Sequence, residues 1–195
     1  DEGVQTTYYL DQDSDGFGDL AVTQDGCEAP QSYVTSDADC NDDDSQINPD
    51  ATEVCDAVDN NCDGEVDENT ASDADIWYQD SDSDGYGSSV SVTSCSQPSG
   101  HVLVGNDCDD NNAVIFPTAM ELCDGLINDC NLSELDPIEI DLDGDGYVTC
   151  NIDTNGWFGA SISGGEDCDD TSNFYTPEDF DNDGASTCQG DCDDT

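Results

Sequence analysis

Residues 11–16 read Asp11-Gln-Asp13-Ser-Asp15-Gly16, and this run of alternate aspartates before a glycine decides the fold. Carboxylates at alternate positions can point toward one centre where a glycine lets the chain turn sharply, and a calcium-binding loop begins in this way. The sequence therefore predicts a cation-binding loop here. The same pattern recurs at 80–85, 141–146 and 179–184.

The pattern assigns ligands by their position in the loop. Side-chain oxygens come from positions 1, 3 and 5, and a backbone carbonyl comes from position 7. The glutamate of an EF-hand at position 12 is missing, so each loop is short of oxygens for an ion that takes about six to eight. The predicted loop ligands are Asp11, Asp13, Asp15 and Phe17; Asp80, Asp82, Asp84 and Tyr86; Asp141, Asp143, Asp145 and Tyr147; and Asp179, Asp181, Asp183 and Ala185.

A second acidic element, which we call the acidic arm, follows each loop and reads Asp-Cys-Asn-Asp or Asp-Cys-Asp-Asp. Aspartate stands at the same two places in all four copies, so the arm is expected to supply the missing oxygens. Hard oxygen donors favour Ca²⁺, since Mg²⁺ demands stricter octahedral geometry. The predicted arm ligands are Asp39, Asp42, Asp107, Asp110, Asp167, Asp170, Asp191 and Asp194.

A third element, the cysteine element, runs from 53 to 68 and has a copy at 121–136. Its first copy contains Asp-Asn-Asn-Cys-Asp-Gly and predicts a further metal site. The second copy has Ile127 and Leu132 in place of the first aspartate and the glycine, which leaves its occupancy open. Together the elements predict roughly six to ten Ca²⁺ per chain. The ligands expected in the first copy are Asp59, Asn61, Asp63, Asp67 and Glu68.

The chain contains twelve cysteines, and the spacing of the first four recurs 68 residues later. Zinc or iron–sulfur ligation would need Cys-x-x-Cys pairs or Cys/His clusters, and the sequence has neither. The even count at repeated spacings instead predicts disulfides and an oxidising, extracellular location. The predicted pairs are local: Cys27–Cys40, Cys55–Cys62, Cys95–Cys108, Cys123–Cys130, Cys150–Cys168 and Cys188–Cys192.

The three elements divide the chain into four repeats, at 1–76, 77–138, 139–178 and 179–195. Short strands are expected at 20–23 and 90–93, and at most single helical turns near 51–54 and 119–122. Hydrophobic residues make up 34% and aromatic residues 7%, which is too little for a large core. The predicted fold class is a small, disulfide-rich, calcium-stabilised repeat array of loops and turns, and the order of elements suggests one stretch of a longer array.

The charge balance restricts both partners and chemistry. The chain has 50 acidic residues, no lysine and no arginine, for a net charge of −50. Nucleic acid and anionic membranes need basic contacts, so neither is an expected partner, and no apolar run is long enough to enter a bilayer. Nucleophilic and phosphoryl-transfer chemistry lack their usual residues, so no enzyme is expected. Without bound cations, the repulsion should expand the chain.

At these residues the chain resembles two families of extracellular repeat. The Asp-x-Asp-x-Asp-Gly stretches with interleaved cysteines resemble thrombospondin type 3 repeats. Residues 39–68, and more loosely 107–136, resemble the bacterial metal-binding repeat of MopE-type, copper-associated surface proteins. The resemblance implies a secreted or surface-anchored, calcium-loaded array. Copper favours imidazole and sulfur, and only His101 and Met120 remain to offer them once the cysteines are paired.

Three hypotheses for function follow. The leading one is a rigid rod, stalk or fibre subunit that self-associates into a filament or surface assembly. The second is a calcium-dependent adhesin that contacts glycans or partner proteins through Trp77, Tyr78, Trp157 and Phe158. The third is a surface protein that sequesters metal.

Overall fold

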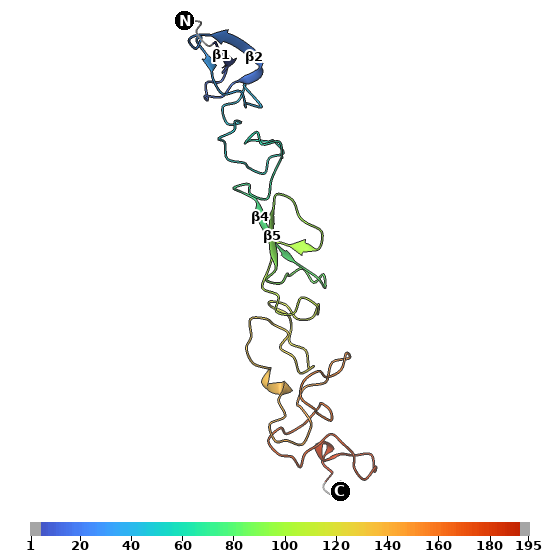
Figure 1. Ribbon diagram of the computed structural model, residues 1–195. Helices are drawn as coiled ribbons and strands as arrows, with labels where there is room; N and C mark the ends of the chain where they lie inside the picture. Colours follow the sequence, from blue (N-terminus) through green and yellow to red (C-terminus); the bar gives the residue numbers. More distant parts are fainter. Residues whose placement is uncertain (1–4, 192–195) are drawn as a thin grey trace. The chain divides into compact units, whose positions relative to one another are not determined.

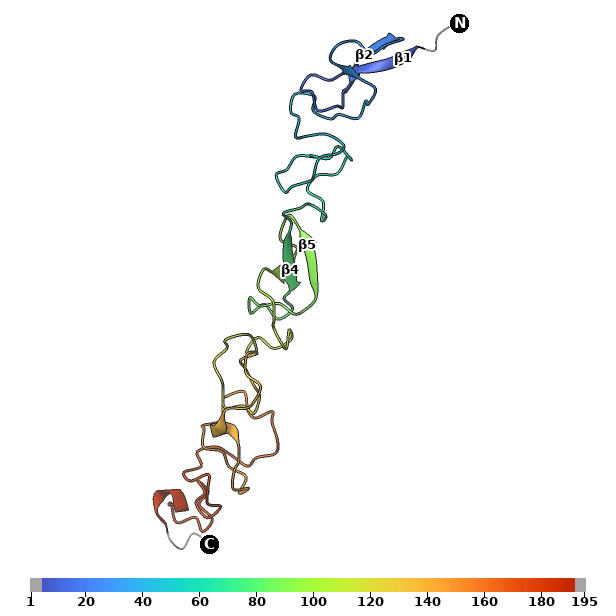
Figure 2. The same ribbon diagram turned by 90° about the vertical axis from the view of Figure 1, so that its left-hand side faces the viewer.

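The computed structural model describes residues 5–191, which form two compact units. The first unit comprises 5–78 with 90–103, and the second comprises 79–89 with 104–191. Figures 1 and 2 show short paired strands separated by long stretches of loop. Cys192 and Asp194 lie outside the described residues, so the prediction that Asp194 is a metal ligand stays untested.

The first sheet has the order β2-β1-β3 and contains β1 (Thr6–Leu10), β2 (Asp19–Gly26) and β3 (Tyr33–Val34). Both neighbours of β1 run antiparallel to it. Tyr8, at the centre of β1, is buried at 8% exposure. The turn into β2 needs Gly18, because a Cβ there would stand 2.6 Å from the carbonyl oxygen of Leu10.

The second sheet repeats this arrangement around β4 (Asp75–Gln79), in the order β5-β4-β6 with β5 (Ser91–Ser94) and β6 (His101–Val102). Trp77 takes the place that Tyr8 has in the first sheet, is buried, and donates from Nε1 to the carbonyl of Ser94 at 3.0 Å. The strands expected at 20–23 and 90–93 are therefore confirmed as parts of β2 and, over 91–93, of β5. In both repeats a buried aromatic lies just before an aspartate loop.

The helical turns expected at 51–54 and 119–122 are wrong. Each stretch follows a tight turn, closed by the bond from Ala51 N–H to Asn48 O or from Ala119 N–H to Phe116 O. A side-chain amide then binds the chain beyond the turn: Asn60 Oδ1 accepts the N–H of Val54 at 3.1 Å, and Asn128 Oδ1 accepts the N–H of Leu122 at 2.7 Å. The described residues contain no α-helix, only the 3-10 turns η1 (Pro137–Glu139) and η2 (Thr187–Gln189).

The apolar interior is small, as the composition predicts. Within 5–191, the hydrophobic residues that are buried are Tyr8, Ala71, Trp77, Ile115, Ala119 and Val148. No helix among the described residues is long and apolar enough to cross a membrane. The fold is thus a disulfide-rich array of loops and turns with short antiparallel strands, and the predicted fold class is confirmed in these respects.

Five disulfides join described residues, and every predicted pair that can be checked is wrong. The observed bridges are Cys40–Cys62, Cys55–Cys95, Cys108–Cys130, Cys123–Cys150 and Cys168–Cys188. Cys27 is an exposed free thiol rather than the predicted partner of Cys40, and Cys188 pairs with Cys168 rather than with Cys192.

The observed pairing follows the order of the elements rather than proximity in sequence. The cysteine of each of the first three acidic arms pairs with a cysteine 20–22 residues further along the chain. The first cysteine of each cysteine element pairs forward with the next repeat, as in Cys55–Cys95 and Cys123–Cys150. Cys27 corresponds to Cys95 and Cys150, whose partners precede them, and residues 1–26 contain no cysteine.

Candidate metal sites

The aspartate loops share one backbone conformation, set by the side chain at position 1. In the second loop, Asp80 Oδ1 accepts the N–H of Ser83 at 2.7 Å. In the third loop, Asp141 accepts two N–H groups, one on each carboxylate oxygen. The residues at positions 4 and 6 have positive φ in all four loops, which explains the glycine at position 6.

Positions 3 and 5 orient the remaining carboxylates. At each position one carboxylate oxygen accepts the N–H two residues ahead: Asp82 from Asp84 at 3.2 Å, and Asp84 from Tyr86 at 2.8 Å. The other loops repeat both bonds. These bonds commit one oxygen of each carboxylate to the loop and leave the second oxygen, Oδ2, for another partner.

The acidic arm docks on its loop through two backbone groups. In the second repeat, the N–H of Ser81, at loop position 2, donates to Asp110 Oδ1 at 2.8 Å, and the N–H of Asp107 donates to Gly87 O at 3.0 Å. Asp42 and Asp170 accept the equivalent position 2 N–H, at 2.8 Å each. The arm therefore lies against the loop as predicted, but these bonds hold it there instead of a disulfide to the preceding cysteine.

Loop and arm together present buried oxygens that lack a donor. Asp107 is 8% exposed and Asp167 is 4% exposed, yet Oδ2 of each has no hydrogen-bond partner among the described residues. Carboxylate oxygens of Asp13, Asp39 and Asp42 lie within 4.8 Å of one another. Burying an unpaired carboxylate is costly, so these oxygens indicate cation sites. Within 5–191, other loop and arm oxygens that are buried without a hydrogen-bond donor include Oδ2 of Asp13, Asp15, Asp39, Asp82, Asp84, Asp143 and Asp145.

The electrostatics of the metal-free sites agree with this geometry. Burial raises the pKa of Asp107, and the nearby carboxylates of Asp84 and Asp82 raise it further, against the lowering effect of the Asp109 N–H. Burial is also the largest cause of the raised pKa of Asp167. The same cause acts in Asp39, Asp84 and Asp145. The chain has no lysine or arginine to reverse these shifts.

Asp110 shows the opposite behaviour. Burial raises its pKa, but the backbone and hydroxyl groups of Ser81 donate to its two oxygens and together bring the pKa below the ordinary value. The arm therefore has two different carboxylates. Asp110 is stabilised as an anion by the loop, whereas Asp107 is buried and lacks a donor on Oδ2.

The first cysteine element forms a fifth loop of the same type. Asp59 accepts the N–H groups of Asp63 and Gly64, and Cys62 and Gly64 have positive φ, as at positions 4 and 6 of the aspartate loops. Glu68 Oε1 accepts from the amide of Asn61 at 3.2 Å, and its buried Oε2 has no partner among the described residues. Asp67 instead accepts the N–H of Ala57, so it supports the loop.

The second cysteine element does not form this loop. Asp129 Oδ1 is engaged by the backbone N–H groups of Thr118 and Asn131, at 2.7 and 2.9 Å. The Asn131 and Thr118 bonds also lower the pKa of Asp129. Asp136 caps the 3-10 turn η1. The loop at 127–136 thus offers no side-chain oxygen at its first position, as the substitution by Ile127 predicts.

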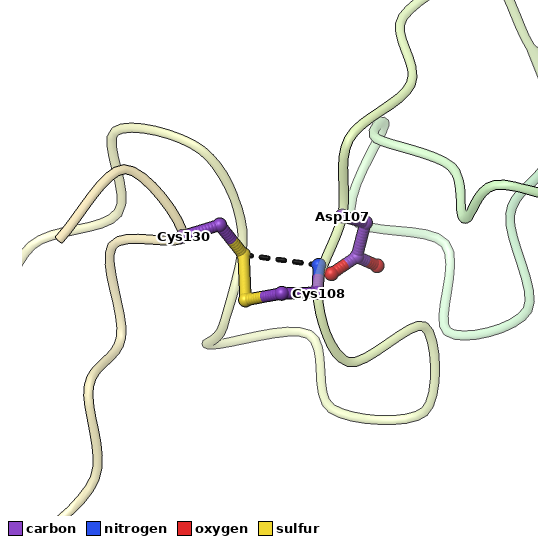
Figure 3. Close-up of side chains that lie close together, drawn as sticks. All are labelled: Asp107, Cys108 and Cys130. Carbon is purple, nitrogen blue, oxygen red and sulfur yellow. Dashed lines mark hydrogen bonds between the residues drawn. A yellow bond between two sulfur atoms is a disulfide. The ribbon is translucent and has the colours of Figure 1, made fainter. Parts of the chain in front are cut away.

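The disulfides place sulfur beside two arms without providing a sulfur ligand. Figure 3 shows Asp107 next to the Cys108–Cys130 bridge, where the N–H of Cys108 donates to Cys130 Sγ at 3.0 Å. Asp167 lies in the same way beside Cys168 and Cys188. Sulfur bound in a disulfide is not a thiolate, so oxygen atoms remain the donors at these sites.

Other predicted ligands differ in their surroundings. The fourth loop keeps the bonds at positions 3 and 5, and Asp179 accepts the N–H groups of Asp183 and Gly184, but Asp181 and Asp183 are exposed. The position 7 residues Phe17, Tyr86, Tyr147 and Ala185 donate their N–H to position 5, and their carbonyls stay predicted ligands.

Sequence reasoning missed three buried or partly buried glutamates, Glu53, Glu121 and Glu139. Glu53 is 5% exposed and accepts the N–H groups of Asn60, Asn61 and Asp67. A signal was present, since Glu-x-Cys-Asp opens both cysteine elements and Ile138-Glu139-Ile140 places a charge between apolar residues.

Comparison with known families finds one match. A family model of the copper-binding MopE type, described as a "putative metal-binding motif", matches residues 39–68 and 107–131. These segments contain the first two acidic arms with the fifth loop and the start of the second cysteine element. The match covers well under half of the chain. No curated protein and no solved structure matches it.

Proposed function

We propose that this chain is a calcium-binding structural protein of the cell surface or extracellular matrix. The observation that carries the proposal is the set of buried, donor-less carboxylate oxygens that loop and arm share in three repeats. Position 3 and position 5 aspartates and the first arm aspartate would hold the ion, with Glu68 in the fifth loop. Bound Ca²⁺ would neutralise the carboxylates that the sequence cannot pair with lysine or arginine.

The donor set supports calcium over copper, although the matched family model is named for copper. The clustered donors of the loops are hard oxygens. Met120 is 82% exposed, and His101 contacts the carbonyl of Ser99 through Nδ1. Ten cysteines are consumed in disulfides, which leaves Cys27 as the thiol among the described residues. Copper binding would have to use sites away from the loops.

The structural role follows from how little else stabilises the chain. Bridges that link successive repeats, thin apolar packing and calcium loops suit a rigid rod, stalk or fibre subunit, and the resemblance to thrombospondin type 3 repeats supports the same role. The disulfides support an extracellular location, because cytosolic thiols are kept reduced. Repeats of one kind along the chain suit self-association into a filament.

The test measures bound metal and dimensions on the same sample. Elemental analysis after gel filtration in buffer with Ca²⁺, Mg²⁺ and Cu²⁺ at equal concentration should show several Ca²⁺ per chain and little copper. X-ray scattering should then show expansion in EDTA and compaction when Ca²⁺ returns. A chain that carries no Ca²⁺, or that keeps its dimensions in EDTA, would exclude the proposal. Electron microscopy of native material would show whether filaments form.

One observation favours a calcium-dependent adhesin as a second candidate. Phe158 is 61% exposed, on a loop fixed by the bond from its N–H to Asp124 O at 2.7 Å. Trp77, also expected as a contact, is instead buried in β4. Loss of attachment to glycan-coated surfaces in a folded Phe158→Ala variant would favour adhesion. Unchanged attachment would leave the structural role as the better account.

A further inference from the structure

A buried carboxylate cluster, made of two residues of the second cysteine element and Glu139 just after it, lies outside the aspartate loops. Glu139 is 3% exposed and Asp124 is 2% exposed. Glu139 Oε1 accepts the N–H groups of Asp124 and Gly125, each at 2.9 Å. Glu139 Oε2 is buried and has no hydrogen-bond partner among residues 5–191. One oxygen of this glutamate therefore fixes the turn, and the other is left in the interior without a donor.

Glu121 and Asp124 bring two further carboxylates to the same turn. The two oxygens of Glu121 accept the N–H groups of Asn128 and Asp129, at 3.3 and 2.6 Å. The fully buried Asn128 side chain donates to Asp124 Oδ2, but only at 3.4 Å, which is long for a hydrogen bond. After burial itself, the charges of Asp124 and Glu121 raise the pKa of Glu139.

Comparison of the two cysteine elements shows which hydrogen bond of the first element Glu139 replaces in the second. In the first element, the N–H of Ala57 donates to Asp67 of the fifth loop. In the second, Leu135 replaces that aspartate, and the equivalent N–H, of Gly125, donates to Glu139. A residue from beyond the degenerate loop thus takes over the structural bond and adds a second, buried oxygen.

We propose that Glu121, Asp124 and Glu139 bind a hard divalent cation, Ca²⁺, in place of the site that the loop at 127–136 has lost. A proton on Glu139 would neutralise one of three negative charges, whereas a divalent ion neutralises two and offers a coordination position to each carboxylate. The chain has no lysine or arginine to do this. The inference rests on the proposed function only for the identity of the ion, because none of the three residues belongs to an aspartate loop.

Glu139→Gln is the informative variant, tested in the full chain with Ca²⁺ alone. Glutamine keeps a carbonyl oxygen for the two N–H donors and replaces the other oxygen by an amide. We expect one bound Ca²⁺ fewer per chain by native mass spectrometry. Glu134→Gln, on the exposed segment before η1, has the same charge change and should leave the count unchanged.

Terbium gives a second readout, because Trp157 packs on the same turn. A Cβ at Gly125 would stand 2.7 Å from Trp157 Cε2. Tb³⁺ at the proposed site should therefore emit under tryptophan excitation. Because Trp77 can sensitise Tb³⁺ in the second loop, the emission should fall rather than vanish in Glu139→Gln and in Asp124→Asn, and should stay at the wild-type level in Glu134→Gln. Asp124→Asn decides the matter if the first variant does not fold, since Asn can still accept the N–H of Leu126 through Oδ1.

Asp143→Asn, in the third loop, separates this inference from the proposed function. If Asp143→Asn loses an ion while Glu139→Gln keeps the full count and the Tb³⁺ emission, the inference is overturned and Glu139 is a protonated acid. If Glu139→Gln loses an ion and Asp143→Asn does not, the site stands and calcium binding by the third loop fails. If neither variant loses an ion, both fail.

Discussion

Replacing Asp107 by asparagine should stabilise the protein without calcium, and calcium should reduce or reverse that gain. Asp107 is 8% exposed, its Oδ1 accepts the N–H of Asp109 at 2.9 Å, and its Oδ2 has no partner among the described residues. Asparagine can keep the bond to Asp109. What it removes is one charge that Asp84, Asp82 and Asp110 repel.

The two effects can be estimated separately. Without calcium, a pair of like charges about 4 Å apart costs roughly 1 kcal/mol in water, so relief from three neighbours should stabilise the variant by about 1–3 kcal/mol. With calcium at about 10–100 times the dissociation constant, a bound ion contributes about 1.4–2.7 kcal/mol. A variant that loses the ion should lose that contribution, so its shift in the free energy of unfolding should be about 1.4–2.7 kcal/mol less favourable in Ca²⁺ than in EDTA.

Urea unfolding followed by circular dichroism, in EDTA and in Ca²⁺, measures both free energies. Asp109→Asn is the matched control, because Asp109 is exposed and the charge change is the same. It should shift the free energy of unfolding by less than about 0.5 kcal/mol in either buffer. If Asp107→Asn shifts stability equally in EDTA and in Ca²⁺, the oxygen does not bind the ion and the reasoning is wrong.

Three further predictions follow from the same structure. Burial raises the pKa of Asp107 and Asp167 above the ordinary 3.8, so the metal-free fold binds protons more tightly than the unfolded chain. Its stability should therefore be greatest below about pH 3.8 and fall as the pH rises through the raised values. Thermal unfolding across an acidic series in EDTA measures this, and a stability that does not fall over that range would contradict the raised pKa values. Replacing Cys108 and Cys130 by serine should lower the free energy of unfolding by about 3 kcal/mol, because it opens a loop of 22 residues. An unchanged free energy in urea unfolding would contradict this disulfide. Gly18→Ala should lower the free energy of unfolding by about 1–3 kcal/mol, because the added Cβ would stand 2.6 Å from the backbone of β1. A variant with wild-type thermal stability would contradict the close approach at this turn.

The local conformation of the loops was predictable because it is encoded within six residues. Alternate aspartates accept the N–H groups two residues ahead, and glycine takes the positive φ at position 6. The docking of the arm was predictable from the ligands that each loop lacks. The failure of the second cysteine element was visible in Ile127 and Leu132, which cannot replace an oxygen donor or a glycine.

The disulfide pairing was not predictable, because the spacing of the cysteines does not show whether each one pairs with an earlier or a later cysteine. Cys55 and Cys62 are close in sequence, but Cys62 has φ 57° in the fifth loop and pairs back to Cys40, while Cys55 pairs forward to Cys95. Glu139 was missed for a related reason. It lies after the repeated element and reaches the turn at Asp124 only through the 3-10 turn that Asp136 caps.

Hydrogen–deuterium exchange, resolved by peptide in Ca²⁺ and in excess EDTA, tests most directly whether bound ions replace a large apolar core. The N–H groups of Ser83, Asp84 and Tyr86 report on the second loop, because each donates to one of its aspartates. We predict that removing calcium abolishes their protection together with that of the strand pair β4–β5. Equal protection of loops and strands in EDTA would contradict the account.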